Sequence, residues 1–186
     1  IILSKNNHAD ERFLLSAGLI LLFAAMNFKV SSAPFHFWTP DVYDGAPTVF
    51  TSFMASIVKS AIFIAFASIF QLQSKNLGTS WSFLFNFVVF ATLFFGNITA
   101  VFQRSVKRMM AYSSIAQAGF MLFAVYNVTS YATEGLLLYV TVYSLASIGV
   151  FAVLIKMKDY SFEAFNGLAK QDPLLAFLMT VFLLSL

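Results

Sequence analysis

Two lysines lie inside long apolar stretches of this sequence, separated by a proline-rich segment. Lys29 is the only formal charge in residues 13–40, and Lys59 is the only one in residues 47–74. Each stretch is long enough to cross a bilayer as a helix, which takes about 20 apolar residues. A lysine at the centre of such a helix costs roughly 2.5 to 3.5 kcal/mol, so each of these lysines needs a structural or functional reason.

Lys59 has the clearer position. It follows Pro47 by 12 residues, which is about 18 Å along a helix and near the middle of a hydrocarbon layer about 30 Å thick. Its ammonium cannot easily reach either membrane surface from there. Ser52 and Ser56 share its helical face at spacing i, i+4, i+7, so this polar stripe is expected to face protein or water rather than lipid. The alternative is a lysine that is merely tolerated.

Lys29 precedes Pro34 by only five residues. It can therefore lie at an ordinary helix end, from which its side chain reaches the surface, or in a helix that is interrupted inside the membrane. The residues after it stay apolar and aromatic as far as Trp38, which favours the interruption. Interrupted helices mark ion paths in transporters, because the break frees backbone groups and helix ends to meet a charge. We therefore predict irregular backbone over residues 33–38, at or near membrane depth.

The composition supports a membrane protein and excludes several chemistries. The chain is 60% hydrophobic and 10% charged, with a mean hydropathy of +0.82, values outside the range of ordinary soluble domains. It has no cysteine, so it cannot supply a disulfide, a thiolate nucleophile, an iron-sulfur ligand set or a cysteine zinc site. Redox chemistry would belong to partners, and no catalytic or metal site is predicted. The net charge of +3 comes mostly from short loops, which suits membrane orientation better than nucleic-acid binding.

The pattern of apolar runs predicts an all-α, polytopic membrane helix bundle that forms a single domain over residues 1–186. About six transmembrane helices are expected, over residues 13–32, 47–72, 81–102, 109–126 and 135–155 and from Pro173 onward. Residues 1–12 are polar enough for an extramembrane loop. The last run has 14 residues, about 21 Å and too short to span. With no initial methionine, the sequence is expected to be a fragment.

Short basic clusters predict the orientation. Residues 103–108 contain three cations between two apolar runs, which is typical of a turn on the cytoplasmic or matrix side. If the helices alternate, this side holds six cations and the opposite side three. The two sets are Arg104, Lys107, Arg108, Lys156, Lys158 and Lys170, and Lys5, Arg12 and Lys75.

Polar residues within two later runs can serve either packing or a hydrated path. Ser113, Ser114 and Gln117 are spaced i, i+1, i+4 and are predicted to share one face. They are uncharged, so they can order water or form hydrogen bonds but cannot themselves hold a proton at neutral pH. The next run supplies a similar stripe from Tyr139, Tyr143, Ser144 and Ser147.

Four motifs give the sequence a family resemblance. They are KVSSAPFHFWTPDVYDGAPT, SIVKSA, GNITAVFQRSVKRMMAYSSIAQAGF and FNGLAKQDPLLAFLMTVFLLSL. Together they resemble the subunit N family of bacterial NADH:quinone oxidoreductase (respiratory complex I), the counterpart of mitochondrial NADH dehydrogenase subunit 2. The resemblance covers nearly the whole chain after Phe13, and implies helices seven to the start of twelve of a fourteen-helix antiporter-like subunit. Mrp-type cation/proton antiporter subunits share the general motif and are the alternative, although PDVYDGAP and Lys59 favour subunit N.

The resemblance also implies roles for single residues. Lys29 matches the family's helix-seven lysine, which is associated with proton transfer beside the broken helix. Lys59 matches the helix-eight lysine, which links one half-channel to the next through a hydrated axis. His36 falls in the connection after the break, where hydrogen-bonding support is favoured over proton carriage. Gln117 stands where many relatives have histidine, so a titratable step is not expected there. The family's helix-five glutamate and helix-twelve lysine would lie outside residues 1–186.

The function implied is proton translocation in the inner membrane of a bacterium or mitochondrion, driven by redox chemistry elsewhere in the complex. NADH, FMN, iron-sulfur clusters and quinone would be held by partner subunits, with no cofactor in this chain. Its own partners would be other membrane-arm subunits, lipid and protons. Two further classes stay open from the residues alone. One is a secondary transporter for a small solute or cation, and the other is a purely structural subunit in which both lysines tolerate apolar replacement.

Overall fold

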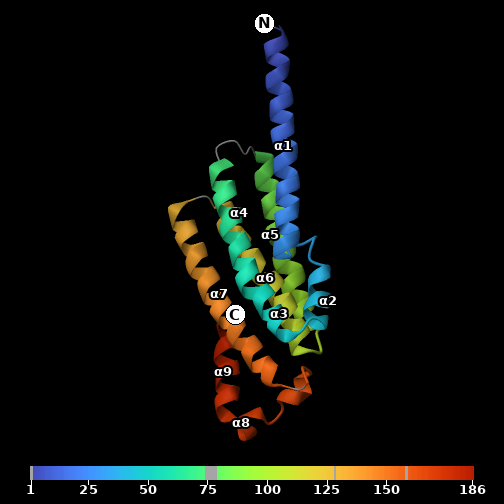
Figure 1. The fold of residues 1–186 in the computed structure, drawn as a ribbon, viewed down its shortest axis with the longest axis vertical. Helices are drawn as coiled ribbons and strands as arrows, with labels where there is room; N and C mark the ends of the chain where they lie inside the picture. Colours follow the sequence, from blue (N-terminus) through green and yellow to red (C-terminus); the bar gives the residue numbers. More distant parts are fainter. Residues whose placement is uncertain (1, 74–78, 128, 158) are drawn as a thin grey trace.

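The computed structural model describes the backbone of residues 2–73, 79–127, 129–157 and 159–186. Every regular element in these ranges is a helix, and the helices form a bundle from which α1 projects (Figure 1). The α-helices are α1 (Ile2–Val30), α2 (Trp38–Gly45), α3 (Thr48–Phe53), α4 (Lys59–Gln73), α5 (Thr79–Val101), α6 (Val106–Tyr126), α7 (Ser130–Lys156), α8 (Leu168–Gln171) and α9 (Pro173–Leu184). A π-helical turn, Met54–Val58, joins α3 to α4, and a 3-10 turn, Phe162–Phe165, precedes α8.

Four continuous helical stretches are long and apolar enough to cross a membrane: Thr48–Phe70, Trp81–Val101, Val106–Tyr126 and Tyr131–Lys156. They lie where the sequence analysis predicted the second to fifth spans. The predicted first and sixth spans correspond to shorter apolar helices, Leu14–Val30 and Pro173–Leu184. The all-α fold is therefore confirmed, with four helices of spanning length among the described residues.

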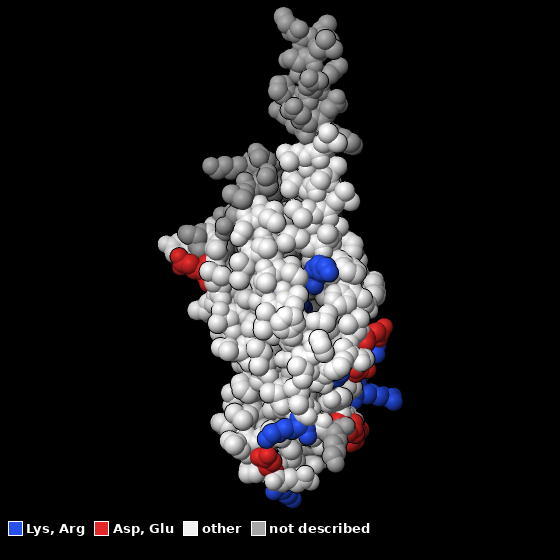
Figure 2. All heavy atoms as spheres, viewed as in Figure 1, with Lys and Arg blue, Asp and Glu red and all other residues white. Residues whose placement is uncertain are grey.

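The outer face of the bundle is apolar. On α5, four phenylalanines at spacing i, i+4, i+7, i+11 are exposed, namely Phe83, Phe87, Phe90 and Phe94. Charged side chains on the visible face gather mainly towards the end that holds α8, and the middle is mostly uncharged (Figure 2). An apolar stripe of this length is stable only against lipid or another protein, because water would make its exposure costly.

Aromatic packing fixes α1 against the bundle. The Phe23 ring of α1 contacts Phe66 and Phe70 of α4 and Trp81 and Phe85 of α5, with centroid distances of 4.7 to 5.9 Å and mostly perpendicular rings. Edge-to-face pairs of this kind contribute about 0.5 to 1.5 kcal/mol each beyond their area burial. Part of the high phenylalanine content thus builds a core between three helices.

Helix α1 ends in the Schellman pattern. Ser32 N–H donates to the Asn27 carbonyl at 3.0 Å, and Ser31 N–H donates to the Phe28 carbonyl at 3.2 Å. Ser31 has a positive φ of 66°, a conformation that costs a non-glycine residue about 1 to 2 kcal/mol. Its Oγ accepts a 2.6 Å hydrogen bond from the Thr39 hydroxyl. This side-chain bond helps to hold the chain in its sharp turn.

The backbone between α1 and α2 is irregular over residues 31–37, as predicted for residues 33–38 except that Trp38 already begins α2. Ala33 N–H donates to the Thr92 hydroxyl of α5 at 2.9 Å, and Phe35 N–H donates to the Ser32 carbonyl at 2.7 Å. Helix α1 ends partway along the bundle and α2 continues towards one end of it (Figure 1). The irregular segment therefore lies partway along the bundle and not past its end.

Two segments differ from the sequence-based expectation. Residues 33–46 were assigned to a connection, but α2 forms within them, because Pro40 lies in its first turn, where a missing N–H is tolerated. Residues 1–12 were assigned to a loop, but α1 begins at Ile2. Polar side chains predict exposure rather than backbone conformation, and extending an existing helix costs much less than nucleating one.

The ends of the helices alternate as the charge analysis assumed. The α2–α3 joint, the α5–α6 corner and α8 lie at one end of the bundle, and the first turns of α5 and α7 lie at the other (Figure 1). Lys107 of that count lies in the first turn of α6, at the α5–α6 corner, and its side chain is buried (3% exposed). The side chains of Lys5, Arg12, Lys75 and Lys158 lie outside the described residues.

Gly96 gives a stability test of the α5–α6 contact. A Cβ on Gly96 would lie 2.6 Å from the Ala116 backbone nitrogen, whereas a Cβ on Gly135 of α7 would meet no atom within 4 Å. We expect Gly96→Ala to lower the stability of the full-length protein by about 1 to 3 kcal/mol, as overpacking does. Gly135→Ala is the matched control and should be neutral or slightly stabilising. Thermal unfolding in detergent measures both, and equal melting temperatures would contradict this close approach.

Candidate functional site

Lys59 is buried where α4 meets α6. It is the first residue of α4, directly after the π-helical turn Met54–Val58, and it is 2% exposed. Its Nζ donates to the Ser114 carbonyl at 2.7 Å and to the Ser114 Oγ at 3.1 Å. The Ser114 hydroxyl in turn donates to the Ala111 carbonyl at 2.9 Å. The structure therefore brings together two of the predicted site residues, Lys59 and Ser114.

The partners of Lys59 are neutral oxygens. Among the described residues, the ion pairs with acidic side chains are made by Arg108, and none involves Lys59. A buried ammonium without a carboxylate is costly, although two hydrogen bonds offset part of that cost. The described residues therefore compensate the charge on Lys59 only in part.

Three more buried hydroxyl groups belong to α2 and α7. Tyr143 and Ser147 of α7 are 4% and 0% exposed, and Tyr43 of α2 is 2% exposed. The Tyr43 and Tyr143 hydroxyls lie close to Ser114. We call Lys59, Ser114, Tyr43, Tyr143 and Ser147 the Lys59 cluster. The Tyr143 hydroxyl and the Ser147 Oγ lack a hydrogen-bond partner among the described residues.

A second polar contact joins α4 to α7 beside the cluster. The Ser60 hydroxyl donates to the Ser56 carbonyl at 2.6 Å and lies 2.7 Å from the Ser144 Oγ. Ser56 is fully buried, and Ser52 lies half-buried one turn earlier. The polar stripe predicted for this helix thus faces other helices. The π-helical turn within it was not predicted, because its residues, MASIV, carry no sequence signal for the extra residue in the turn.

The side chains of Ser113, Ser114 and Gln117, which were predicted to share one face, have different surroundings. Ser113 lines a separate cavity of about 360 Å³ between α5, α6 and the chain near Leu186. The Gln117 side chain accepts a hydrogen bond from the Tyr139 hydroxyl and donates one to the Leu186 carbonyl. Successive residues of a helix point about 100° apart, which lets Ser113 and Ser114 have different surroundings.

His36 and Lys29 lie away from the cluster. His36 is 7% exposed in the interruption, stacked on Phe37 at 4.5 Å and near Phe95 at 6.0 Å, and its Nδ1 has no partner among the described residues. Lys29 lies in the last turn of α1 with an exposed side chain. The structure does not bring Lys29 to Lys59.

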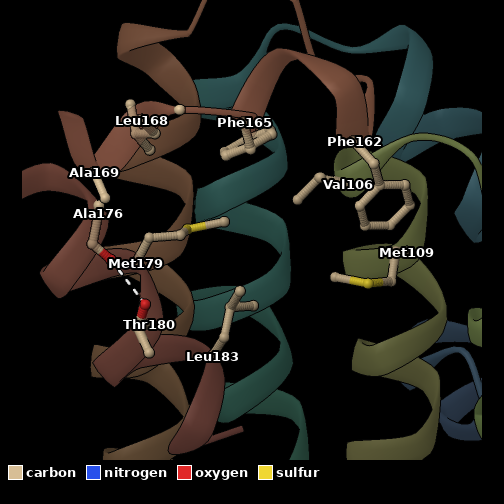
Figure 3. A pocket seen from close by; sticks show the side chains of 11 residues that line it. Val106, Met109, Phe162, Phe165, Leu168, Ala169, Ala176, Met179, Thr180 and Leu183 are labelled. Carbon is tan, nitrogen blue, oxygen red and sulfur yellow. Dashed lines mark hydrogen bonds between the residues drawn. The ribbon is translucent and has the colours of Figure 1, made fainter. Parts of the chain in front are cut away.

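An apolar pocket of about 320 Å³ lies elsewhere, at the end of the bundle where α9 passes α6 (Figure 3). Val106, Met109 and Phe162 lie on one side of it and the α9 residues on the other, and the lining carries no charged side chain. This pocket has none of the polar groups of the Lys59 cluster. In the part of the chain that is described, no group of three histidine or acidic residues can hold a metal ion.

The apolar outer face, the interrupted helix and the polar cluster inside the bundle define a polytopic integral membrane protein. The family described as NADH:quinone oxidoreductase/Mrp antiporter, TM, matches residues 2–186, and the chain belongs to this family. NADH-quinone oxidoreductase subunit N 1 of Herpetosiphon aurantiacus is 43% identical over 188 residues, covering 98% of this chain and 38% of that protein. The protein of the same name from Aquifex aeolicus is 38% identical over 182 residues, covering 95% of this chain and 39% of that protein.

Solved structures show the same fold. A chain of respiratory complex I from Thermus thermophilus superposes with a TM-score of 0.74 at 38% identity, covering 86% of this chain and 35% of that chain. A chain of the membrane-bound sulfane sulfur reductase, an archaeal respiratory membrane complex, superposes with a TM-score of 0.72 at 28% identity, covering 84% and 33%. The present chain therefore spans between a third and two fifths of the length of these relatives.

The two unpartnered hydroxyls give a prediction about bound water. Buried polar groups are almost always satisfied by protein or ordered water. We therefore expect a water molecule within hydrogen-bond distance of the Tyr143 hydroxyl and the Ser147 Oγ. A density map of the full-length protein that resolves water would show it. A dry site, with Tyr143 and Ser147 still buried and unpaired, would contradict the prediction.

Proposed function

We propose that this chain is the central part of a subunit N of NADH:quinone oxidoreductase, from helix seven to the start of helix twelve, and that it carries protons across the membrane. The observation that carries the proposal is Lys59, an ammonium 2% exposed inside an apolar bundle, whose hydrogen-bond partner among the described residues is Ser114. Membership of the family and the relatives named subunit N support the same assignment.

Lys59 would act as a proton carrier within the bundle. Burial makes the charged form costly, and a carboxylate supplied from outside this chain would stabilise it. Moving that carboxylate, or changing its charge, would load and unload the proton. The neighbouring hydroxyls of the Lys59 cluster can order the water through which a proton arrives or leaves.

Lys29 would be a second proton-transfer residue, at the interruption of the first helix. Its exposed side chain in the last turn of α1 leaves it open to a partner from a further helix or subunit. His36, Ser113 and Gln117 would support the break or line hydrated space. This assignment agrees with the buried Nδ1 of His36 and the cavity beside Ser113.

The complex would supply everything that this chain lacks. NADH, FMN, iron-sulfur clusters and quinone would be bound by partner subunits, and other membrane-arm subunits and lipid would cover the exposed apolar face. We place the protein in the bacterial inner membrane, as its bacterial relatives suggest, or in the mitochondrial inner membrane if it is organellar.

An Mrp-type cation/proton antiporter subunit is the second candidate, because the matching family includes both classes. The two differ in what moves with the proton. Flux that changes when a sodium gradient is exchanged for a potassium gradient favours the antiporter. Proton movement that follows quinone reduction in any salt favours subunit N.

Substitution of Lys59 tests the proposal. Lys59→Met keeps most of the side-chain volume and removes a charge that costs about 2.5 to 3.5 kcal/mol at the membrane centre, so the complex should assemble. Quinone reductase activity and coupled proton pumping should fall about tenfold or more. Lys59→Arg should fail as well, because its guanidinium stays protonated.

Pumping and quinone reduction are measured in membrane vesicles that contain the whole complex. Lys170→Met is the matched control, because Lys170 is exposed on α8, and it should behave like the parent. A Lys59→Met complex that pumps at the parental proton-to-electron ratio would reduce Lys59 to a tolerated residue. Loss of assembly would instead indicate a structural charge pair.

A further inference from the structure

Lys107 is a second buried lysine, and its partners are backbone groups. It is 3% exposed, and its Nζ donates to the Asp44 carbonyl at 3.0 Å and to the Ala46 carbonyl at 2.6 Å. The same Nζ lies 5.2 Å from the centre of the Tyr160 ring. The side chain therefore closes the C-terminal end of α2 instead of facing solvent in the α5–α6 corner.

These partners suit a cation in a fixed position. The last carbonyls of a helix have no N–H partner within the helix and carry a partial negative charge. Carbonyl oxygens only accept hydrogen bonds, and the face of a tyrosine ring attracts a cation. The ammonium of Lys107 thus acts as a cap on α2, and it is supplied by α6.

Other bonds converge on the same joint. The Tyr160 hydroxyl lies 2.9 Å from the Thr48 Oγ1 at the start of α3, and the Tyr160 carbonyl accepts from Val106 N–H at 2.8 Å. Arg108 pairs with the Asp41 carboxylate of α2 at 2.9 Å. The end of α2, the beginning of α3 and the beginning of α6 are therefore tied together at one point. Lys107 is the buried charge in the middle of it.

The joint and the Lys59 cluster share one face of α6. Lys107, Met110, Ala111 and Ser114 are spaced i, i+3, i+4, i+7, and all four are buried. Two helical turns, about 10.5 Å, separate Lys107 from Ser114. From the joint, the chain runs through α3 and the π-helical turn to Lys59, which binds Ser114. Contacts on one face of α6 therefore hold both ends of the segment that carries Lys59.

We propose that Lys107 is a positioning residue, which fixes the α2–α3 joint on α6 so that Lys59 meets Ser114. The inference rests on the proposed role of Lys59 in proton transfer, and it adds the device that sets the position of Lys59. Lys107 itself passes no proton in this account. Arginine can therefore replace it, because a guanidinium also donates to carbonyl oxygens and stacks on an aromatic ring.

A cysteine pair reports the position of Lys59 without any measurement of activity. The hydroxyls of Ser60, which follows Lys59, and Ser144 of α7 lie 2.7 Å apart, so Ser60→Cys with Ser144→Cys should form a disulfide under a membrane-permeant oxidant. The pair is introduced into the full-length protein within its complex, and the cross-linked fraction is measured over time. In this background we compare Lys107→Met, Lys107→Arg and, as a matched control, Lys170→Met.

The expected pattern separates positioning from other roles. Lys107→Met should slow cross-linking about tenfold, because a capped helix end loses its charged donor, and Lys107→Arg and Lys170→Met should cross-link like the parent pair. Cross-linking of Lys107→Met at the parental rate would overturn the inference. If Lys107→Met does not accumulate, cross-linking is measured in Lys107→Gln, which keeps a hydrogen-bond donor but not the charge. Slower cross-linking is again expected, and the parental rate would overturn the inference.

Proton pumping gives the second readout, in complexes without the cysteines. Lys107→Met should lose coupled pumping and Lys107→Arg should retain it, in contrast to Lys59, where arginine should fail. Loss of pumping in Lys107→Arg with normal cross-linking would make Lys107 a proton carrier and overturn the inference. Normal pumping by Lys59→Met would refute the proposed function alone, because the cross-linking result does not depend on it.

Discussion

The contact between the Lys59 ammonium and Ser114 is the interaction around which this bundle is arranged. A lysine 2% exposed in an apolar interior is tolerable only where hydrogen-bond acceptors are held at a fixed distance. Ser114 provides two, its carbonyl and its hydroxyl. Small residues let neighbouring helices approach closely. Gly96 of α5 lies so near Ala116 of α6 that a Cβ would not fit between them. Close packing of α5 on α6 thus helps to hold the helix that supplies Ser114.

The interruption after α1 is governed by a different requirement, namely that backbone groups inside an apolar bundle must be paired. Side chains do this work here. Thr92 of α5 accepts from Ala33 N–H, and the Thr39 hydroxyl donates to Ser31. These buried polar residues hold an irregular segment in place and need no role in proton transfer. Polar residues in such helices therefore either pair irregular backbone or take part in proton transfer, and only their contacts distinguish the two roles.

Sequence reasoning predicted the features that follow from apolar context. Lys59 stood out because its neighbours are uncharged, and the break followed from Pro34 and the aromatic residues around it. Features that depend on contacts between helices were not predictable in the same way. Lys107 was assigned with Arg104 and Arg108 to a basic turn on one side of the membrane, and only the packing of α2 on α6 shows that its side chain is buried. The π-helical turn depends on helix geometry that composition does not encode.

The hydrogen-bond partners of the two buried lysines differ, and this difference suits Lys59 to proton transfer and Lys107 to positioning. The oxygens around Lys107 are backbone carbonyls, which can only accept. A neutral amine could still donate its two N–H groups to them, but neither carbonyl could donate to its lone pair. Lys59 has a carbonyl and a hydroxyl, and the hydroxyl now donates to the Ala111 carbonyl. If Lys59 loses its proton, that hydroxyl can rotate and donate to the amine, while the Ser114 carbonyl still accepts. The lone pair of the neutral amine then has a donor at Lys59, whereas the two carbonyls at Lys107 offer it none.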